Sequence, residues 1–218
     1  MLAKLFALVL LCLTIPFALR VDGGKVETIG AFADSGASDS LKKALEPKGN
    51  RVIVDGKVLC EIWLRSDLPS GKNDAQGAAY TSLSDSALIA VITFPLQAID
   101  FRKQVIKSGS YTVRYAVHPQ DGDHLGISPI RDFLLLVPVA LDQDPNAKYK
   151  FEELVALSKK TSGANHPSPL SLVSPDGIST WPSVFADEYE HLVFAAKIKT
   201  GAGGDTAVAF VVKGVAVQ

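Results

Sequence analysis

The sequence predicts a mainly β protein, folded as an antiparallel β-sandwich or a jelly-roll-like domain. Eight or nine short apolar segments are separated by turns rich in glycine and proline, and one segment near residues 151–160 has a helical pattern. Strands and helices do not alternate along the chain, which argues against a parallel, doubly wound sheet. The length of 218 residues suits one large domain of this class.

The first two expected strands form a hairpin. Residues Arg51–Val54 and Lys57–Arg65 are strand-like, and the Asp55-Gly56 dipeptide between them favours the positive φ angles of a type I′ turn. Along the second strand, Cys60 falls on the same apolar face as Ile62. Cys60 is therefore expected to be a buried hydrophobic residue, with a reactive thiol as the alternative.

The middle of the chain is expected to supply the central strands. Residues Ser86–Phe94 and Asp132–Ala140 are almost continuously apolar, as strands covered on both faces are. Residues 111–117 alternate instead, and residues 101–106 are expected to form a further strand. The alternation places Tyr111, Val113, Tyr115 and Val117 on one face and Thr112, Arg114, Ala116 and His118 on the other.

One helix is expected at Phe151–Lys160. Its apolar residues recur at helical spacing, its acidic residues come first, its lysines come last, and Gly163 stands just past its end. The remaining strands are expected at Leu170–Val173, Glu190–Lys199 and Thr206–Val217. The last two form a terminal hairpin.

The N-terminal segment predicts export. Residues 1–20 join a short positive start to an apolar run of about 15 residues, which is the size of a signal-peptide core and short for a membrane span. An uncleaved N-terminal anchor is the alternative, and it is the only expected membrane contact. Residues 21–49 are polar and read as a linker or loosely attached arm, so residues 50–218 are expected to form a single β-sandwich domain. The expected location is secreted, periplasmic or in the cell envelope.

Composition excludes one class of partner. The formal net charge is −1, and no run of lysines or arginines occurs. Electrostatic binding to nucleic acid is therefore not expected.

The loop 118–132 carries the densest group of possible ligands in the chain. His118, Asp121, Asp123 and His124 lie within seven residues. Two imidazoles and two carboxylates suit Zn²⁺ or Cu²⁺. Aspartates also form turns by bonding their own backbone, so a structural polar loop and a ligand-recognition loop are the alternatives.

A second loop offers another imidazole. His166 lies in the loop 163–169 and would complete a metal set with His118 and His124. Elsewhere, no HExxH motif and no paired CxxC motif supports a metal site.

Two arginines flank the loop 118–132. Arg114 and Arg131 are expected to hold Asp121, Asp123 or Asp132 by paired hydrogen bonds and so order the loop. The alternative is an anion-binding pair of arginines.

Catalytic patterns are missing from the sequence. There is no GxSxG motif, and the calcium-loop spacing at 142–153 has Ala147 where a glycine is needed. Trp63 is expected to be half exposed, and no spacing rule links it to Trp181, so packing is favoured over sugar binding for both. A non-enzymatic protein without a cofactor is therefore expected.

Two segments resemble a family of uncharacterised bacterial secreted proteins. They are GSYTVRYAVHPQDGDHLGISPIRDFLLL at 109–136 and FEELVALSKKTSGANHPSPLSL at 151–172, and the resemblance covers about 60 residues. It implies a β-sandwich in a bacterial envelope protein. It brings no activity and no known functional residues.

The expected function is binding. We expect a secreted or periplasmic β-sandwich that binds a ligand or an envelope partner through the loops 118–132 and 163–169. The alternative is a Zn- or Cu-binding protein or a metal-dependent enzyme, which would use His118, Asp121, Asp123, His124 and His166.

Overall fold

The computed structural model of the protein describes residues 24–69, 71–119, 130–201 and 203–216. It contains a seven-stranded antiparallel sheet in the order β1-β2-β3-β4-β7-β8-β9, a three-stranded sheet β10-β11-β12 and a two-stranded hairpin β5-β6. The strands are β1 Lys25–Ile29, β2 Gly49–Val54, β3 Lys57–Leu64, β4 Leu88–Phe94, β5 Ala98–Ile99, β6 Val105–Ile106, β7 Gly109–Val117, β8 Asp132–Pro138, β9 Pro169–Ser171, β10 Ser183–Ala186, β11 Leu192–Lys199 and β12 Asp205–Lys213. The helices are α1 Asp39–Lys43, the 3₁₀ turn η1 Val139–Leu141, and α2 Phe151–Ser162.

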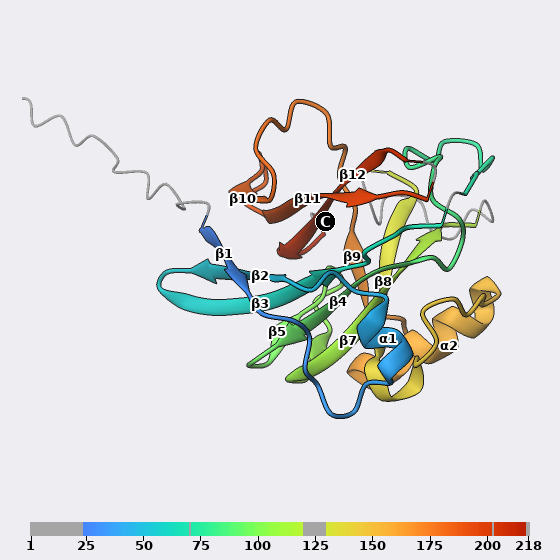
Figure 1. Ribbon diagram of the computed structural model, residues 1–218, viewed down its shortest axis with the longest axis horizontal. Coiled ribbons are helices and arrows are strands. Elements are labelled where there is room, and N and C mark those ends of the chain that lie inside the picture. The colour runs from blue at the N-terminus through green and yellow to red at the C-terminus, as the bar shows by residue number, and fades with distance from the viewer. Residues whose placement is uncertain (1–23, 70, 120–129, 202, 217–218) are drawn as a thin grey trace, which may run out of the picture.

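The two larger sheets pack face to face around the main core, so the mainly β, antiparallel sandwich is confirmed (Figure 1). Fully buried side chains from both sheets meet there, including Ile62 and Leu134 from one and Phe194 and Phe210 from the other. At one edge, an isolated bridge between Leu172 and Phe210 joins the sheets. Such sheets pack about 10 Å apart, which leaves room for interlocking side chains and little else.

Strand β7 has the two faces that its alternation predicts. Tyr111, Val113 and Tyr115 enter the sandwich core, while Ala116 faces α2 on the outside. Helices α1 and α2 both cover the outer face of the seven-stranded sheet, so the protein has a helix layer, a large sheet and a small sheet (Figure 1).

The hairpin and helix signals are confirmed at their turns. Asp55 and Gly56 have φ angles of 50° and 72°, as a type I′ turn requires. At the start of α2, the backbone N–H of Lys150 donates to Glu153 Oε2 at 2.9 Å, and at its end Gly163 takes the left-handed conformation with φ 72°.

The linker expected at 21–49 differs from the structure. Strand β1 pairs along its whole length with β2, and Leu41 of α1 is fully buried. This segment covers Trp63, whose ring lies 5.0 Å from that of Phe32 and whose Nε1 donates to Gly30 O at 2.8 Å. Trp63 is therefore buried rather than half exposed, because a polar segment supplies a few well-placed apolar side chains.

Other boundaries differ less. The strand expected at 101–106 is reduced to β6, and β10 lies where no strand was expected. Cys60 is fully buried in the main core, and burial raises the pKa of its thiol, so the hydrophobic reading of this residue is confirmed.

Candidate functional site

The loop 118–132 is described only at its two ends. Asp121, Asp123 and His124 lie outside the described residues. At the base of the loop, the His118 N–H donates to Arg131 O at 3.0 Å, so the last bond of the β7–β8 ladder closes the loop. The His118 ring stacks on Phe133, with ring centres 4.0 Å apart and planes 15° apart. His118 therefore has a fixed position at the end of β7.

In the described part of the chain, Arg131 binds backbone oxygens. Its guanidinium donates to Gln76 O and to His118 O, and it thereby joins the loop 66–85 to the base of the loop 118–132. Of the three expected carboxylate partners, Asp132 instead accepts backbone N–H groups and the Tyr115 hydroxyl. Asp121 and Asp123 lie outside the described residues, so pairing of Arg131 with either of them stays a prediction.

Arg114 has a different partner from the expected one. It is fully buried, and its Nε and Nη2 donate to Asp142 at 2.5 and 2.7 Å. Its other protons reach the backbone oxygens of Ser86, Asp144 and Ala147. Every guanidinium edge is therefore used inside the protein, and no side remains for a ligand. The prediction that Arg114 contributes to a binding loop is wrong.

Asp132 holds the loop 66–85. Its carboxylate is fully buried and accepts the N–H groups of Ala79 and Tyr80 at 2.7 and 3.0 Å, and the Tyr115 hydroxyl at 2.5 Å. Burial and this carboxylate raise the pKa of Tyr115. Both described ends of the loop 118–132 therefore bind the loop 66–85, while the prediction that Asp121 and Asp123 order the loop through their own backbone concerns residues outside the described ones.

The two loops predicted to bind do meet. His118 and His166 line one pocket of about 280 Å³, which is here named the loop pocket. Phe133 of β8 and Phe151 and Val155 of α2 form its apolar wall. The polar lining residues are Arg102, His118, Lys159, Asn165 and His166. A mostly apolar cleft with a few polar groups is the usual form of a small-ligand site.

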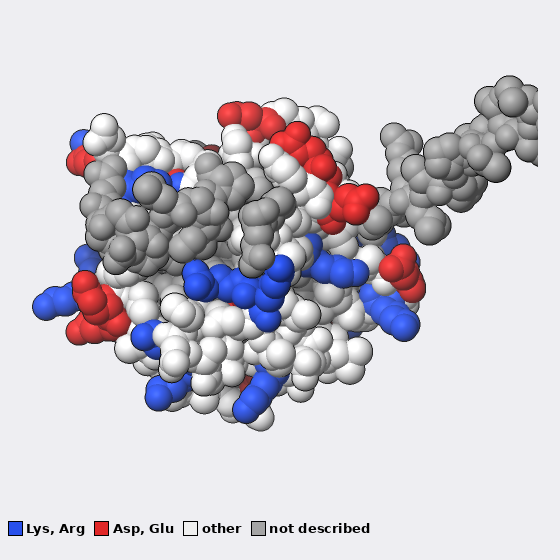
Figure 2. Space-filling model, turned by 180° about the vertical axis from the view of Figure 1, so that it is seen from behind, with Lys and Arg blue, Asp and Glu red and all other residues white. Residues whose placement is uncertain are grey.

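The charged side chains among the described residues that line the loop pocket are all basic. Its described lining residues include a lysine, an arginine and two histidines, and no aspartate or glutamate. Figure 2 shows a row of lysine and arginine side chains across the middle of one face, with acidic side chains above the row and beside basic ones at the left and right edges. A ligand that carries a negative group is therefore favoured in the loop pocket.

Asp100 supports the arginine that lines the loop pocket. Asp100 is buried at the turn of the β5–β6 hairpin and accepts the N–H groups of Arg102 and Gln104, both at 2.9 Å. Gln104 Nε2 donates to the same carboxylate at 2.8 Å and to Pro167 O at 2.7 Å. Burial raises the pKa of Asp100 in spite of these bonds.

Replacing Asp100 with asparagine is expected to change how stability depends on pH. The pKa of Asp100 is about 3.9 in the unfolded chain and higher in the folded protein. At pH values between these two pKa values, the folded wild type binds more protons than the unfolded chain. The wild type therefore loses stability as pH rises through this window, and the asparagine variant does not. In urea unfolding measured from about pH 3 to about pH 7, the free energy of unfolding of the variant should rise relative to that of the wild type as the pH increases. Asp205→Asn, at an exposed position, is the control. If its free energy of unfolding rose relative to the wild type by the same amount over this pH range, the prediction would be contradicted.

Two of the residues predicted to bind a metal lie in the same pocket. His118 and His166 share the loop pocket, but within the described part of the chain no three histidine, cysteine or carboxylate side chains are grouped as metal ligands. The other members of the proposed set lie outside the described residues. Zn or Cu binding stays a prediction.

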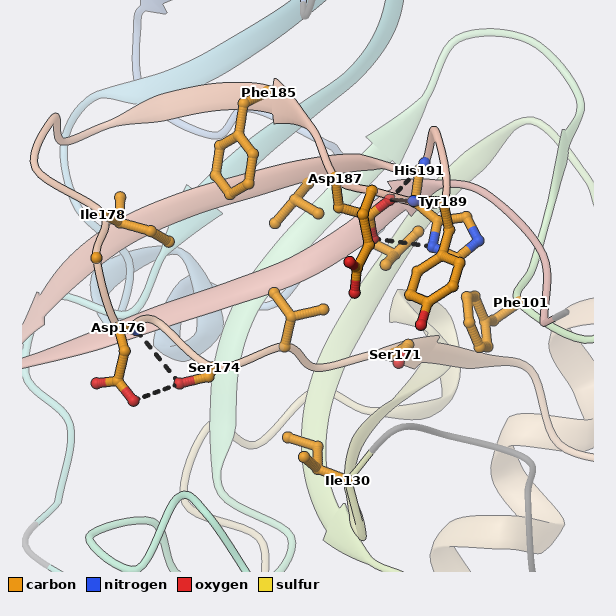
Figure 3. Close-up of a pocket in the computed structure, with 15 residues that line it drawn as sticks. Phe101, Ile130, Ser171, Ser174, Asp176, Ile178, Phe185, Asp187, Tyr189 and His191 are labelled. Atoms are coloured by element: carbon orange, nitrogen blue, oxygen red, sulfur yellow. Dashed lines mark hydrogen bonds and ion pairs between the residues drawn. The ribbon is translucent and has the colours of Figure 1, made fainter.

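Sequence reasoning missed a larger pocket of about 490 Å³, here named the sheet pocket (Figure 3). It lies on the outer face of the three-stranded sheet, where Val193 and Val211 form its floor. Figure 3 shows Phe185 and Ile178 at one end and Phe101 and Tyr189 at the other. These residues are spread over about half of the chain, so no single window could have indicated the site.

The chain was compared with protein families, curated proteins and solved structures. No family model, no curated protein and no solved structure matches the chain. In the described residues, no helix has both the length and the apolar character needed to cross a membrane. The resemblance to secreted bacterial proteins and the expected signal or anchor at 1–20 therefore stay predictions.

Proposed function

We propose that this protein is a non-enzymatic, secreted or periplasmic β-sandwich that binds a small anionic ligand between the loops 118–132 and 163–169. The observation that carries the proposal is the loop pocket: both loops contribute a histidine to it, and its charged lining is entirely basic among the described residues. The aromatic wall of Phe133 and Phe151, whose ring centres lie 6.4 Å apart, suits an apolar body on the ligand.

The position of the pocket also supports binding. His118 is held by its stacking on Phe133 and by its backbone bond to Arg131, and Lys159 lies in the last turn of a capped helix. Groups held by rigid elements lose little conformational entropy when a ligand arrives. The volume of about 280 Å³ lies just below the usual range for small-molecule sites, about 300–1,000 Å³, so a small probe with one aromatic ring and one acidic group is the suitable choice.

Benzoate is the probe for this proposal, with benzyl alcohol as its neutral counterpart. In an ¹⁵N-labelled sample, benzoate is expected to shift the amide signals of Val155 and His166 to saturation, with a Kd of about millimolar order. Lys159→Gln is expected to weaken binding about threefold or more at low salt, because it removes a partly desolvated positive charge. Lys160→Gln, one residue away and outside the pocket, is the matched control.

Two results would contradict the proposal. One is equal binding of benzyl alcohol and benzoate, and the other is equal weakening by the two lysine variants. Zn²⁺ added to the same samples tests the metal alternative, which the shared placement of His118 and His166 favours. A stoichiometric Zn²⁺ complex that His166→Asn abolishes would replace anion binding as the conclusion.

A further inference from the structure

The sheet pocket opens over an apolar surface that the chain covers only in part. The outer face of the three-stranded sheet is apolar, and residues 174–182 cover part of it through Ile178 and Trp181. The uncovered part forms the pocket, with a volume of about 490 Å³. This volume is in the usual range for small-molecule sites, about 300–1,000 Å³.

Three aromatic rings border the sheet pocket: Phe101, Phe185 and Tyr189. Tyr189 is 55% exposed, so its ring is accessible to a ligand in the pocket. Phe101 and Tyr189 stand together at one end of the pocket and Phe185 stands at the other (Figure 3). Aromatic faces attract organic cations through the ring quadrupole, so the end that carries Phe101 and Tyr189 is the one that favours a cationic group.

The charged groups at this pocket are of the opposite sign to those of the loop pocket. Asp176, Asp187 and Glu188 line it, and its described lining contains no lysine or arginine. Asp187 is occupied, because it accepts the N–H groups of Tyr189 and His191 and lies 3.0 Å from His191 Nδ1. Asp176 accepts the Ser174 hydroxyl at 2.8 Å. Glu188 is exposed at the pocket and is the carboxylate best able to turn toward a ligand.

The turn that carries Tyr189 and Glu188 is held in place by contacts of His191. The His191 ring bridges the Asp187 carboxylate and Val215 O, each at 3.0 Å, and meets Phe101 edge to face at 5.4 Å. The turn at 187–190 is closed by the Glu190 N–H donating to Asp187 O. The aromatic and acidic groups therefore stand on a pre-formed frame.

We propose that the sheet pocket is a second binding site, which takes an organic cation with an apolar body, such as an aryl- or alkylammonium compound. The apolar floor accommodates the body, the rings of Tyr189 and Phe101 accept the cation at one end of the pocket, and Glu188, next to Tyr189 in the chain, balances its charge. This site is independent of the loop pocket and of the anionic ligand proposed there.

Benzylamine is the probe, and benzyl alcohol is the neutral counterpart of the same shape. Benzylamine is expected to shift the amide signals of Ile178, Phe185 and Tyr189 to saturation, while benzyl alcohol binds at least about threefold more weakly. Glu188→Gln and Tyr189→Leu are each expected to weaken benzylamine binding about threefold or more at low salt. Glu190→Gln, in the same turn but outside the pocket lining, should leave it unchanged.

The folded state of each variant is read from the same amide spectra, and the substituted positions are surface-exposed. Equal affinity for benzylamine and benzyl alcohol would overturn the proposal. So would undiminished benzylamine binding in both Glu188→Gln and Tyr189→Leu, or benzylamine shifts confined to the loop pocket. Benzoate binding at the loop pocket reports on the other proposal, so the failure of one is distinguishable from the failure of the other.

Discussion

Replacing Arg114 with methionine is expected to lower the free energy of unfolding by about 3–5 kcal/mol. The change leaves the Asp142 carboxylate buried without its cation, leaves the backbone oxygens of Ser86 and Ala147 without the donor they have in the wild type, and leaves Asp144 O with the Ala147 N–H alone. Asp142 keeps only the hydroxyls of Thr112 and Tyr149, at 2.5 and 2.9 Å, as partners. Equilibrium unfolding in urea, followed by tryptophan fluorescence, measures the effect.

An exposed ion pair provides the control for Arg114. Arg51 lies 2.6 Å from Glu61 with 38% of its side chain exposed, so Arg51→Met should cost less than about 1 kcal/mol. Removing both members of the buried pair, in Arg114→Met with Asp142→Leu, should cost clearly less than the sum of the two single changes. A loss for Arg114→Met no larger than for Arg51→Met would show that the buried network does not stabilise the fold.

Replacing Asp132 with alanine is expected to cost about 3 kcal/mol and to loosen the loop 66–85. The change removes the acceptor for two backbone N–H groups and for the buried Tyr115 hydroxyl, and an unsatisfied buried donor costs about 1–3 kcal/mol. Hydrogen exchange at the amides of Ala79 and Tyr80 should accelerate more than at the central strands, because their bond to the carboxylate is lost.

Asp74 lies in the same loop and serves as the control for Asp132. Its side chain is 75% exposed and pairs with Lys72 at the surface, so Asp74→Ala should change stability by less than about 0.5 kcal/mol. If exchange at Ala79 and Tyr80 were unchanged in Asp132→Ala, the carboxylate would not be what holds this loop.

Elements whose causes are local were predictable. The Asp-Gly turn, the alternation along β7 and the capped helix α2 each depend on residues within one short window. Steric preference and hydrophobic period act over such windows whatever the rest of the chain does. This is why the fold class and most strands could be predicted.

Elements whose partners are distant were not predictable. Arg114 has carboxylates nearer in sequence, yet it pairs with Asp142, 28 residues away, because its face of β7 is turned outward beneath the segment 142–149. Likewise β1 reads as a polar arm until pairing with β2 satisfies its backbone groups. Which side chain meets which is decided by how the sheet and its covering segments pack.

The sequence by itself determined a mainly β sandwich with one principal helix and a buried Cys60, and it predicted two polar loops as the place for a ligand. Only the tertiary structure decided the use of each group: it buried Arg114 and Asp132 in structural networks, brought His118 beside His166, and opened a second pocket on the small sheet. The physical reason is the distance along the chain over which each interaction acts. Strand and turn preferences are local, whereas ion pairs and pockets form between segments that are brought together only when the two sheets close over a common core.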